Sequence, residues 1–180
     1  LIYDDFENII YNDSDLGHYI LGSPETIANF DTEKIKAFFK RQYQPSNMIL
    51  FSFGKTPFKK VERLSEKYFV FDNSNLGIIK PRVKPVLNAA QSIVMNKDTS
   101  QSHVLFGGYS MDMHNDDRFA LYLLNNMLGG GNASSRLNNS LREKNGLVYH
   151  VESIVTTYTD TGLFAVYFAT DNKNVDKCMK

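Results

Sequence analysis

The sequence predicts an α/β fold of the α+β type, in which helices pack against an antiparallel-rich mixed sheet. Two patterns support this class. Apolar residues recur mostly at helical spacing in the first half of the 180-residue chain, whereas apolar runs typical of paired strands flank two helices in the second half. The hydrophobic fraction is 42%, with 13 Phe and 10 Tyr, which is sufficient for a core.

The first half of the chain is predicted to be mostly helical. Residues 1–11 carry apolar residues on one helical face, and Ser23-Pro24 supplies an N-cap and a first-turn proline for a short helix. Asp31 is expected to cap the next helix, and Thr56-Pro57 to begin another. Between these two helices, the apolar run at 47–54 predicts a buried strand. The helix after Asp31 is expected to bury a stripe of Ile35, Phe38 and Phe39.

The second half is predicted to place two helices between pairs of strands. The first helix begins at about Asp116, has little polar face and is therefore expected to be largely buried, and ends at Gly129-Gly130-Gly131. The second runs over 134–144 with Leu137 and Leu141 facing inward, and Asn145-Gly146 ends it. The strands are predicted at 91–97, 102–109, 147–157 and 162–169.

The segment between the halves and the two chain ends suggest how the chain is organised. Residues 71–90 contain two prolines and a glycine without a sustained period, which is typical of a linker. Asp171 is expected to cap a last helix of about two turns, which is short for an isolated helix. The helix at 1–11 lacks an N-cap. We therefore expect the chain to be a segment of a longer protein.

Composition and charge exclude several classes of function. Acidic and basic residues balance at 20 each, which argues against general nucleic-acid binding because that activity needs a basic surplus or stripe. No apolar run approaches the roughly 20 residues that span a bilayer, so no membrane partner is expected. The single Cys178 excludes an intramolecular disulfide and a cysteine metal cluster.

No complete metal site or nucleophile–base set is present in the sequence. The four histidines, at 18, 103, 114 and 150, lack a partner at the i+4 spacing that lets two imidazoles share an ion. His150 and Glu152 alternate on one strand, where a surface ion pair is expected. Ser134 and Ser135 follow three glycines, but neither a G-x-S-x-G motif nor a Gly-Lys-Ser/Thr sequence is present.

Arg142 and Tyr149 form the remaining candidate pair. Arg142 falls in the last turn of a predicted helix, and Tyr149 lies early in the next strand, on the expected face of Leu147, Val151 and Val155. A chain reversal at 145–146 could bring the phenol near the guanidinium. Both groups donate hydrogen bonds suited to a carbonyl oxygen or a developing oxyanion. By spacing alone, a helix-end arginine and a packed strand tyrosine are the favoured interpretation, and the functional pair is the alternative.

Two long segments resemble a known family. LGGGNASSRLNNSLREKNGLVYHVES at 128–153, followed by LFAVYFAT at 163–170, resembles the pitrilysin/insulinase family of zinc metallopeptidases. It is most similar to the bacterial branch related to mitochondrial processing peptidase. The segment LGHYILGSPETIANFDTEKIKAFFKRQYQPSNMILFSFG at 16–54 resembles the same family downstream of its metal site. The two segments occur in the family's order and, with the residues between them, cover nearly the whole chain.

The resemblance implies a role for the candidate pair. In this family two homologous halves close around a peptide, and the half without metal contributes an Arg and a Tyr at this spacing to the substrate. These residues would be Arg142 and Tyr149, with Gly129, Gly130, Gly131 and Ser135 assigned to substrate binding. The family's H-x-x-E-H motif is absent, so the resemblance implies zinc in the longer protein only and no metal ligand in this segment.

The same resemblance divides the chain and identifies its partners. Residues 1–72 would end the catalytic half, 73–88 would be the linker, and 89–180 would begin the non-catalytic half; the two outer segments could fold together as one permuted domain. The expected partners are a peptide or unfolded polypeptide and the zinc-bearing half or subunit, and a dimer is possible. The function implied is the substrate-clamping part of a zinc endopeptidase, inactive alone. The alternative is a non-enzymatic peptide-binding or partner subunit.

Overall fold

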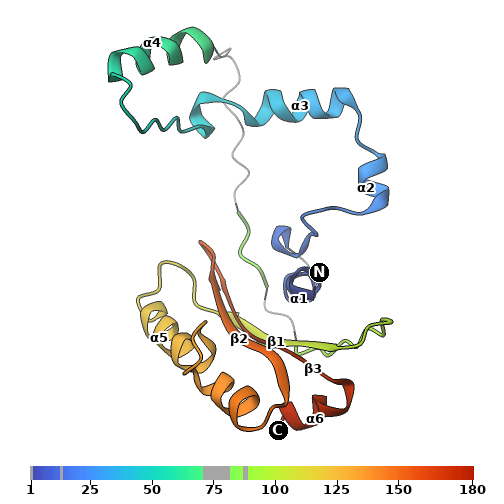
Figure 1. Cartoon of the computed structure of the whole chain (residues 1–180). Coiled ribbons are helices and arrows are strands. Elements are labelled where there is room, and N and C mark those ends of the chain that lie inside the picture. The colour runs from blue at the N-terminus through green and yellow to red at the C-terminus, as the bar shows by residue number, and fades with distance from the viewer. Residues whose placement is uncertain (1, 13, 71–81, 87–88) are drawn as a thin grey trace. The chain divides into compact units, whose positions relative to one another are not determined.

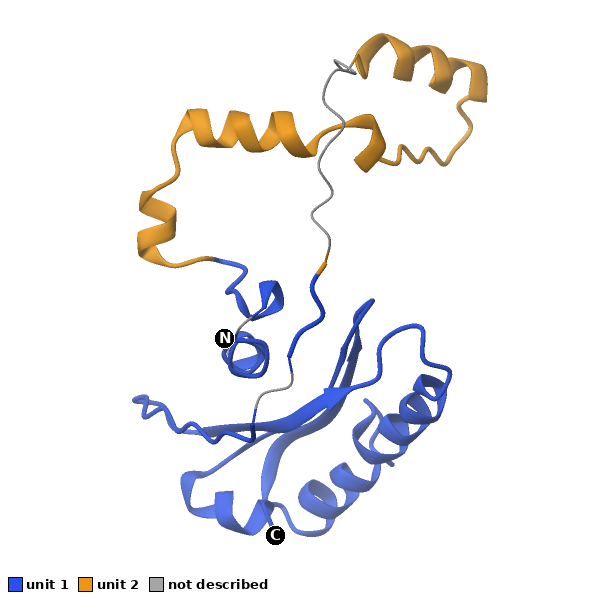
Figure 2. Cartoon of the chain, turned by 180° about the vertical axis from the view of Figure 1, so that it is seen from behind, with its two compact units in different colours: residues 1–21, 83–180 blue, residues 22–82 orange. Residues whose placement is uncertain are grey.

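The computed structural model describes residues 2–12, 14–70, 82–86 and 89–180. It contains two compact units, which are coloured separately in Figure 2. Unit 1 comprises Leu1–Leu21 and Val83–Lys180, and unit 2 comprises Gly22–Arg82. Most of the predicted linker at 73–88 lies outside the described residues. The assignment of residues 1–72 and 89–180 to catalytic and non-catalytic halves stays a prediction.

Unit 1 is built on a three-stranded antiparallel sheet (Figure 1). Its strands are β1 (Ser102–Ser110), β2 (Val148–Thr157) and β3 (Gly162–Thr170), in the order β1-β3-β2. β2 and β3 form a hairpin whose turn is closed by a 2.9 Å hydrogen bond from the Tyr158 nitrogen to the Thr161 oxygen. These strands confirm the predictions at 102–109, 147–157 and 162–169. The mixed α/β class is confirmed as well.

One face of the sheet packs against helices from the second half of the chain. These are α5 (Arg118–Gly129), the π-helix η3 (Asn138–Lys144), and α6 (Val175–Cys178), which follows the 3-10 turn η4 (Asn172–Asn174). The core consists of Val148, Val151 and Phe168, and Phe168 is only 1% exposed. Val104, Leu137, Leu141, Leu147 and Cys178 pack around it, so the inward orientation of Leu137 and Leu141 is confirmed.

The opposite face of the sheet is covered by α1 (Ile2–Ile10), which confirms the helix predicted at 1–11. Neighbouring residues of a strand point to opposite faces, and Tyr167, next to Phe168, has its ring 5.4 Å from that of Tyr3 on α1. Tyr11, just after α1, is fully buried, and its hydroxyl donates a 3.0 Å hydrogen bond to the Gly162 oxygen. The segment that contains α1, Tyr11 and the 3-10 turn η1 (Asp15–Gly17) therefore belongs to unit 1, and Tyr11 is buried within it.

Unit 2 consists of short helices, of which the first two have side-chain N-caps. They are α2 (Pro24–Ala28), α3 (Thr32–Gln42), the 3-10 turn η2 (Pro45–Asn47) and α4 (Phe58–Tyr68). Ser23 makes a capping box with Thr26 at the start of α2. Asp31 accepts a 2.8 Å hydrogen bond from the Lys34 nitrogen at the start of α3. The predicted caps and helix starts are thus confirmed, since they depend on contacts within a single turn.

Several burial predictions are wrong. Residues 47–54 form no strand, and Ile49 and Phe53 are 96% and 93% exposed, because no described strand of unit 2 pairs with them. Residues 91–97 form no strand either. The expected buried stripe of α3 is exposed, at 59% for Ile35, 53% for Phe38 and 56% for Phe39.

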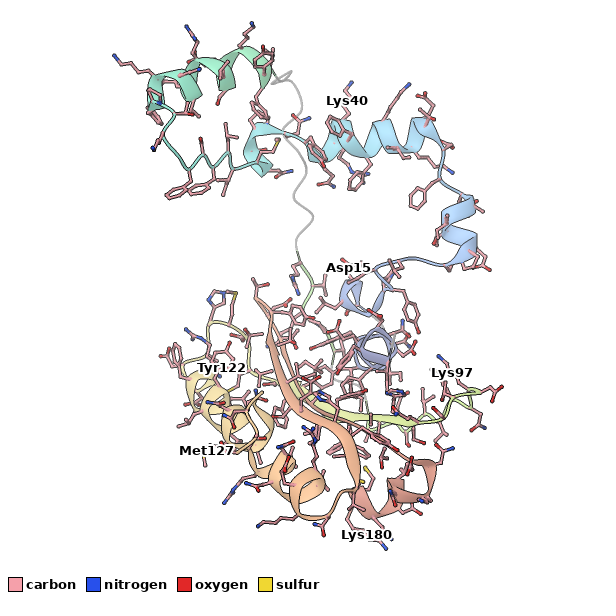
Figure 3. The ribbon with its side chains drawn as sticks, viewed as in Figure 1. Asp15, Lys40, Lys97, Tyr122, Met127 and Lys180 are labelled. Atoms are coloured by element: carbon pink, nitrogen blue, oxygen red, sulfur yellow. The ribbon has the colours of Figure 1, made fainter. Side chains whose placement is uncertain are left out.

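The prediction that the helix after Asp116 is largely buried is also wrong. α5 packs against β2 along one side only. Its outward side leaves Leu123 63% and Met127 51% exposed, and Figure 3 labels Tyr122 and Met127 on this helix. A helix with apolar residues on all sides can be buried on all sides. Whether it is buried depends on how many other elements pack against it.

Candidate functional site

Arg142 lies on η3, close to its C-terminal end, and is exposed. The Arg142 oxygen accepts a 2.9 Å hydrogen bond from the Gly146 nitrogen, and Gly146 has a φ of 57°, so the chain leaves the helix at the predicted Asn145-Gly146 break. No side chain of the described residues pairs with the guanidinium. Arg142 can therefore donate to a ligand that approaches from solvent.

Tyr149 lies at an irregularity in β2. Val148 pairs with Thr170 and His150 pairs with Ala169, so the register shifts across Tyr149. Tyr149 is 55% exposed, while Val148 and Val151 are 6% and 7% exposed. The expectation that Tyr149 shares a face with Val151 is therefore wrong, because a bulge inserts one residue and reorients its side chain.

Tyr149 has an unexpected partner. Its hydroxyl donates a 2.8 Å hydrogen bond to Asp171 Oδ1, which follows β3 directly. This bond is the first cause of the raised pKa of Tyr149, because ionising the phenol would place two negative charges together. No hydrogen bond joins Arg142 to Tyr149. Asp171 was expected to cap a helix, but its side chain makes no capping bond.

Gly129, the last residue of α5, and Gly131, in the loop before η3, have different surroundings. A Cβ on Gly129 would collide with the backbone nitrogen of Ser153 on β2, so this glycine lets the end of α5 approach the sheet. A Cβ on Gly131 would meet nothing within 4 Å, so this position is open. The packing of Gly129 is sufficient to require a glycine there without any ligand.

Ser135 lines a small concavity next to this loop. The concavity has a volume of about 330 Å³. The Ser135 side chain is 3% exposed, and its hydroxyl has no hydrogen-bond partner. A buried polar group without a partner is costly unless something else supplies one. The residues that line the concavity are Asn126, Met127, Asn132, Ser134, Ser135 and Arg136.

The described residues of this chain do not fit a zinc site. No three His, Cys, Asp or Glu side chains among them lie close enough together to share an ion. His150 Nε2 lies 3.6 Å from Glu152 Oε1 on the surface, as the alternation of the two residues on one strand predicts, and Tyr3 donates a 2.8 Å hydrogen bond to the same oxygen. No described helix is long and apolar enough to cross a bilayer.

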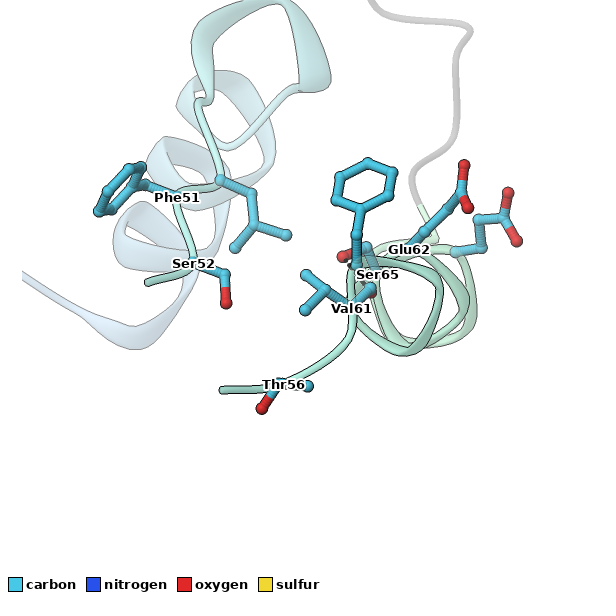
Figure 4. Close-up of a pocket in the computed structure, with 9 residues that line it drawn as sticks. Phe51, Ser52, Thr56, Val61, Glu62 and Ser65 are labelled. Atoms are coloured by element: carbon cyan, nitrogen blue, oxygen red, sulfur yellow. Dashed lines mark hydrogen bonds between the residues drawn. The ribbon is translucent and has the colours of Figure 1, made fainter. Parts of the chain in front are cut away.

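Unit 2 has a larger concavity of its own, of about 500 Å³ (Figure 4). It lies between residues 50–52 and α4, and Val61 and Phe58 contribute much of its apolar lining. None of the site residues predicted from the sequence borders it. Its remaining lining residues are Leu50, Phe51, Ser52, Thr56, Glu62, Ser65 and Glu66.

Comparison with known proteins identifies the family. A family model described as the peptidase M16 inactive domain matches residues 29–180. The chain belongs to the peptidase M16 family. This is the pitrilysin/insulinase group that the sequence resembles, and the family assignment made from the sequence is confirmed.

M16 relatives and a solved M16 structure agree with this assignment. An uncharacterized zinc protease of Streptomyces coelicolor is 31% identical over 172 residues, which cover 92% of this chain and 37% of that protein. One of Rickettsia felis is 31% identical over all 180 residues and 43% of its own length. The crystal structure of a peptidase M16 inactive domain from Pseudomonas fluorescens has a TM-score of 0.83 at 22% identity, covering 98% of this chain and 44% of that one. The chain thus spans about two fifths of these M16 relatives.

Proposed function

We propose that the full-length polypeptide is a zinc-dependent endopeptidase and that this segment is the metal-free part that clamps the peptide substrate. Arg142 orients and polarises the substrate carbonyl, and Tyr149 donates a hydrogen bond to the tetrahedral intermediate. The observation that carries the proposal is the bulge in β2, at which the Tyr149 side chain is 55% exposed while Val148 and Val151 on either side of the bulge are buried. Bulges often redirect a side chain in this way next to active sites.

Three further features support this role. The guanidinium of Arg142 is exposed and unpaired among the described residues, so it is available to a carbonyl oxygen. Arg142 lies in a π-helix, a rare conformation that is frequent at functional sites. The open surroundings of Gly131 suit close approach by the backbone of an extended peptide. Zinc would be supplied by the other half of the polypeptide or by a partner subunit.

Tyr149→Phe in the full-length polypeptide tests the proposal. Removing one donor to a developing oxyanion should lower kcat for peptide hydrolysis about 10²–10³-fold. Tyr19→Phe is a matched control, because the Tyr19 hydroxyl also donates to an aspartate, Asp5, at 2.9 Å, away from the proposed site. It should retain wild-type turnover. Equal activity of Tyr149→Phe and the wild type would refute the role of the phenol.

The sequence upstream of Leu1 separates the two functional hypotheses. An H-x-x-E-H motif followed by a more distal glutamate, in the same polypeptide or in a companion chain, would support the peptidase. If neither carries the motif, a non-enzymatic peptide-binding subunit is the better description.

A further inference from the structure

Tyr149 needs something other than the sheet to hold its side chain in one place. The register shift removes it from the regular ladder of β2 and β3, and more than half of its surface is exposed. An exposed side chain without a fixed contact populates several rotamers. A hydrogen-bond donor that acts on a developing charge must instead be held in position before the reaction.

Asp171 lies where it can supply that contact. It follows Thr170, which pairs with Val148 across the sheet and is fully buried. The Thr170 hydroxyl donates a 2.5 Å hydrogen bond to the Leu147 oxygen, which fixes the end of β3 against the start of β2. Asp171 therefore sits on a well-anchored part of the backbone, one residue beyond the last pair of the ladder.

The carboxylate of Asp171 is also free for this contact. Its backbone oxygen accepts a 2.9 Å hydrogen bond from the Asn174 nitrogen and so begins the turn η4. Its side chain makes no capping bond there and instead accepts the Tyr149 hydroxyl at 2.8 Å. An aspartate before a helical turn usually accepts a hydrogen bond from a backbone N–H of that turn. In Asp171 the hydrogen bond from Tyr149 takes the place of this capping bond.

We propose that Asp171 is a positioning residue that holds the Tyr149 phenol ready to donate to substrate. This inference rests on the proposed function of Tyr149. The phenol has a single O–H group, which donates its hydrogen bond to Asp171 while the site is empty and exchanges it for one to a substrate oxygen when a peptide is bound. The hydrogen bond to the carboxylate also raises the pKa of the phenol, which favours its protonated, hydrogen-bond-donating form.

A double-mutant cycle in the full-length polypeptide tests this inference. Asp171→Ala should lower kcat for peptide hydrolysis about 10- to 100-fold with little change in KM, because the phenol is no longer held in the productive orientation. Asp171→Asn retains an acceptor oxygen and should restore most of the rate. In a Tyr149→Phe background, Asp171→Ala should have no further effect. A loss of equal size in both backgrounds would overturn the inference.

A titration in this 180-residue chain supplies a second readout. With ¹³C-labelled tyrosine, the Tyr149 resonance can be assigned from Tyr149→Phe, and its pKa should fall toward the ordinary value of about 10 in Asp171→Ala. An unchanged Tyr149 pKa would contradict the contact. Asp5→Ala, which removes the acceptor of the Tyr19 hydroxyl, is the matched control and should leave both the Tyr149 pKa and kcat unchanged.

The outcomes distinguish this inference from the proposed function. Wild-type turnover in Tyr149→Phe, or a full-length polypeptide without peptidase activity, would overturn both. Impaired turnover in Tyr149→Phe together with wild-type turnover in Asp171→Ala would overturn only the role of Asp171.

Discussion

Unit 1 and unit 2 contain similar proportions of apolar side chains but use them differently. In unit 1, paired strands carry a core in which Phe168 and Tyr11 are almost wholly inaccessible. In unit 2, the capped helix α3 leaves Phe38 more than half exposed, and the irregular segment after it leaves Phe51 and Phe53 more than half exposed as well. The difference shows that local signals are enough to form helices, whereas burial requires elements that face one another. The candidate site residues all belong to the unit whose backbone is held by such pairing.

The largest expected contrast between the units comes from removing one phenylalanine from each. Phe168→Ala should destabilise unit 1 by about 3–5 kcal/mol, because it removes a buried ring and leaves a cavity. Phe53→Ala, at a position 93% exposed, should change the free energy of unfolding by less than about 0.5 kcal/mol. Urea denaturation followed by circular dichroism measures both. Similar losses for the two variants would mean that the segment around Phe53 is buried in solution.

A change of pH is expected to alter the free energy of unfolding by a smaller amount, and only in unit 1. Burial raises the pKa of Tyr11, so its neutral form is favoured in the folded state. The folded pKa lies above the unfolded value of about 10, so this contribution is complete below pH 10 and is lost as pH rises through the folded pKa. Unit 1 should become less stable between neutral pH and pH 11. Tyr11→Phe should reduce this loss in urea denaturation, and a wild-type stability independent of pH over this range would exclude the effect.

The predictions from sequence succeeded where the determinants are local. Ser23 and Asp31 cap their helices through contacts within one turn, and the strands predicted at 147–157 and 162–169 are adjacent in sequence and pair as a hairpin. The pairing of 47–54 depends on a distant strand, which the run itself cannot specify. Its apolar character therefore predicted a burial that the described residues do not provide.

In the candidate site, too, long-range pairing determines what the sequence does not predict, here the environment of Tyr149. The sequence around Arg142 and Tyr149 predicts both as site residues, and their role stays a prediction; the family assignment itself is confirmed. A period-2 pattern, however, places Tyr149 on the face of Val151, since it contains no signal for the register shift. Asp171 is 22 residues from Tyr149 in the chain, and its local sequence predicts a helix cap. Only the pairing of β2 with β3 brings the two together.

The central claim is that Arg142 of unit 1 contacts the substrate, and the turnover of Arg142→Ala in the full-length polypeptide tests it most directly. Arg142 is exposed and has no partner among the described residues, so its removal should not affect the fold. Arg41→Ala is its matched control, an exposed arginine of unit 2 that lies over the Phe38 ring. We predict that Arg142→Ala lowers kcat for peptide hydrolysis about 10²–10³-fold at an unchanged melting temperature, and that Arg41→Ala does not lower it. Wild-type turnover in Arg142→Ala would contradict the assignment of the substrate-contacting site to unit 1.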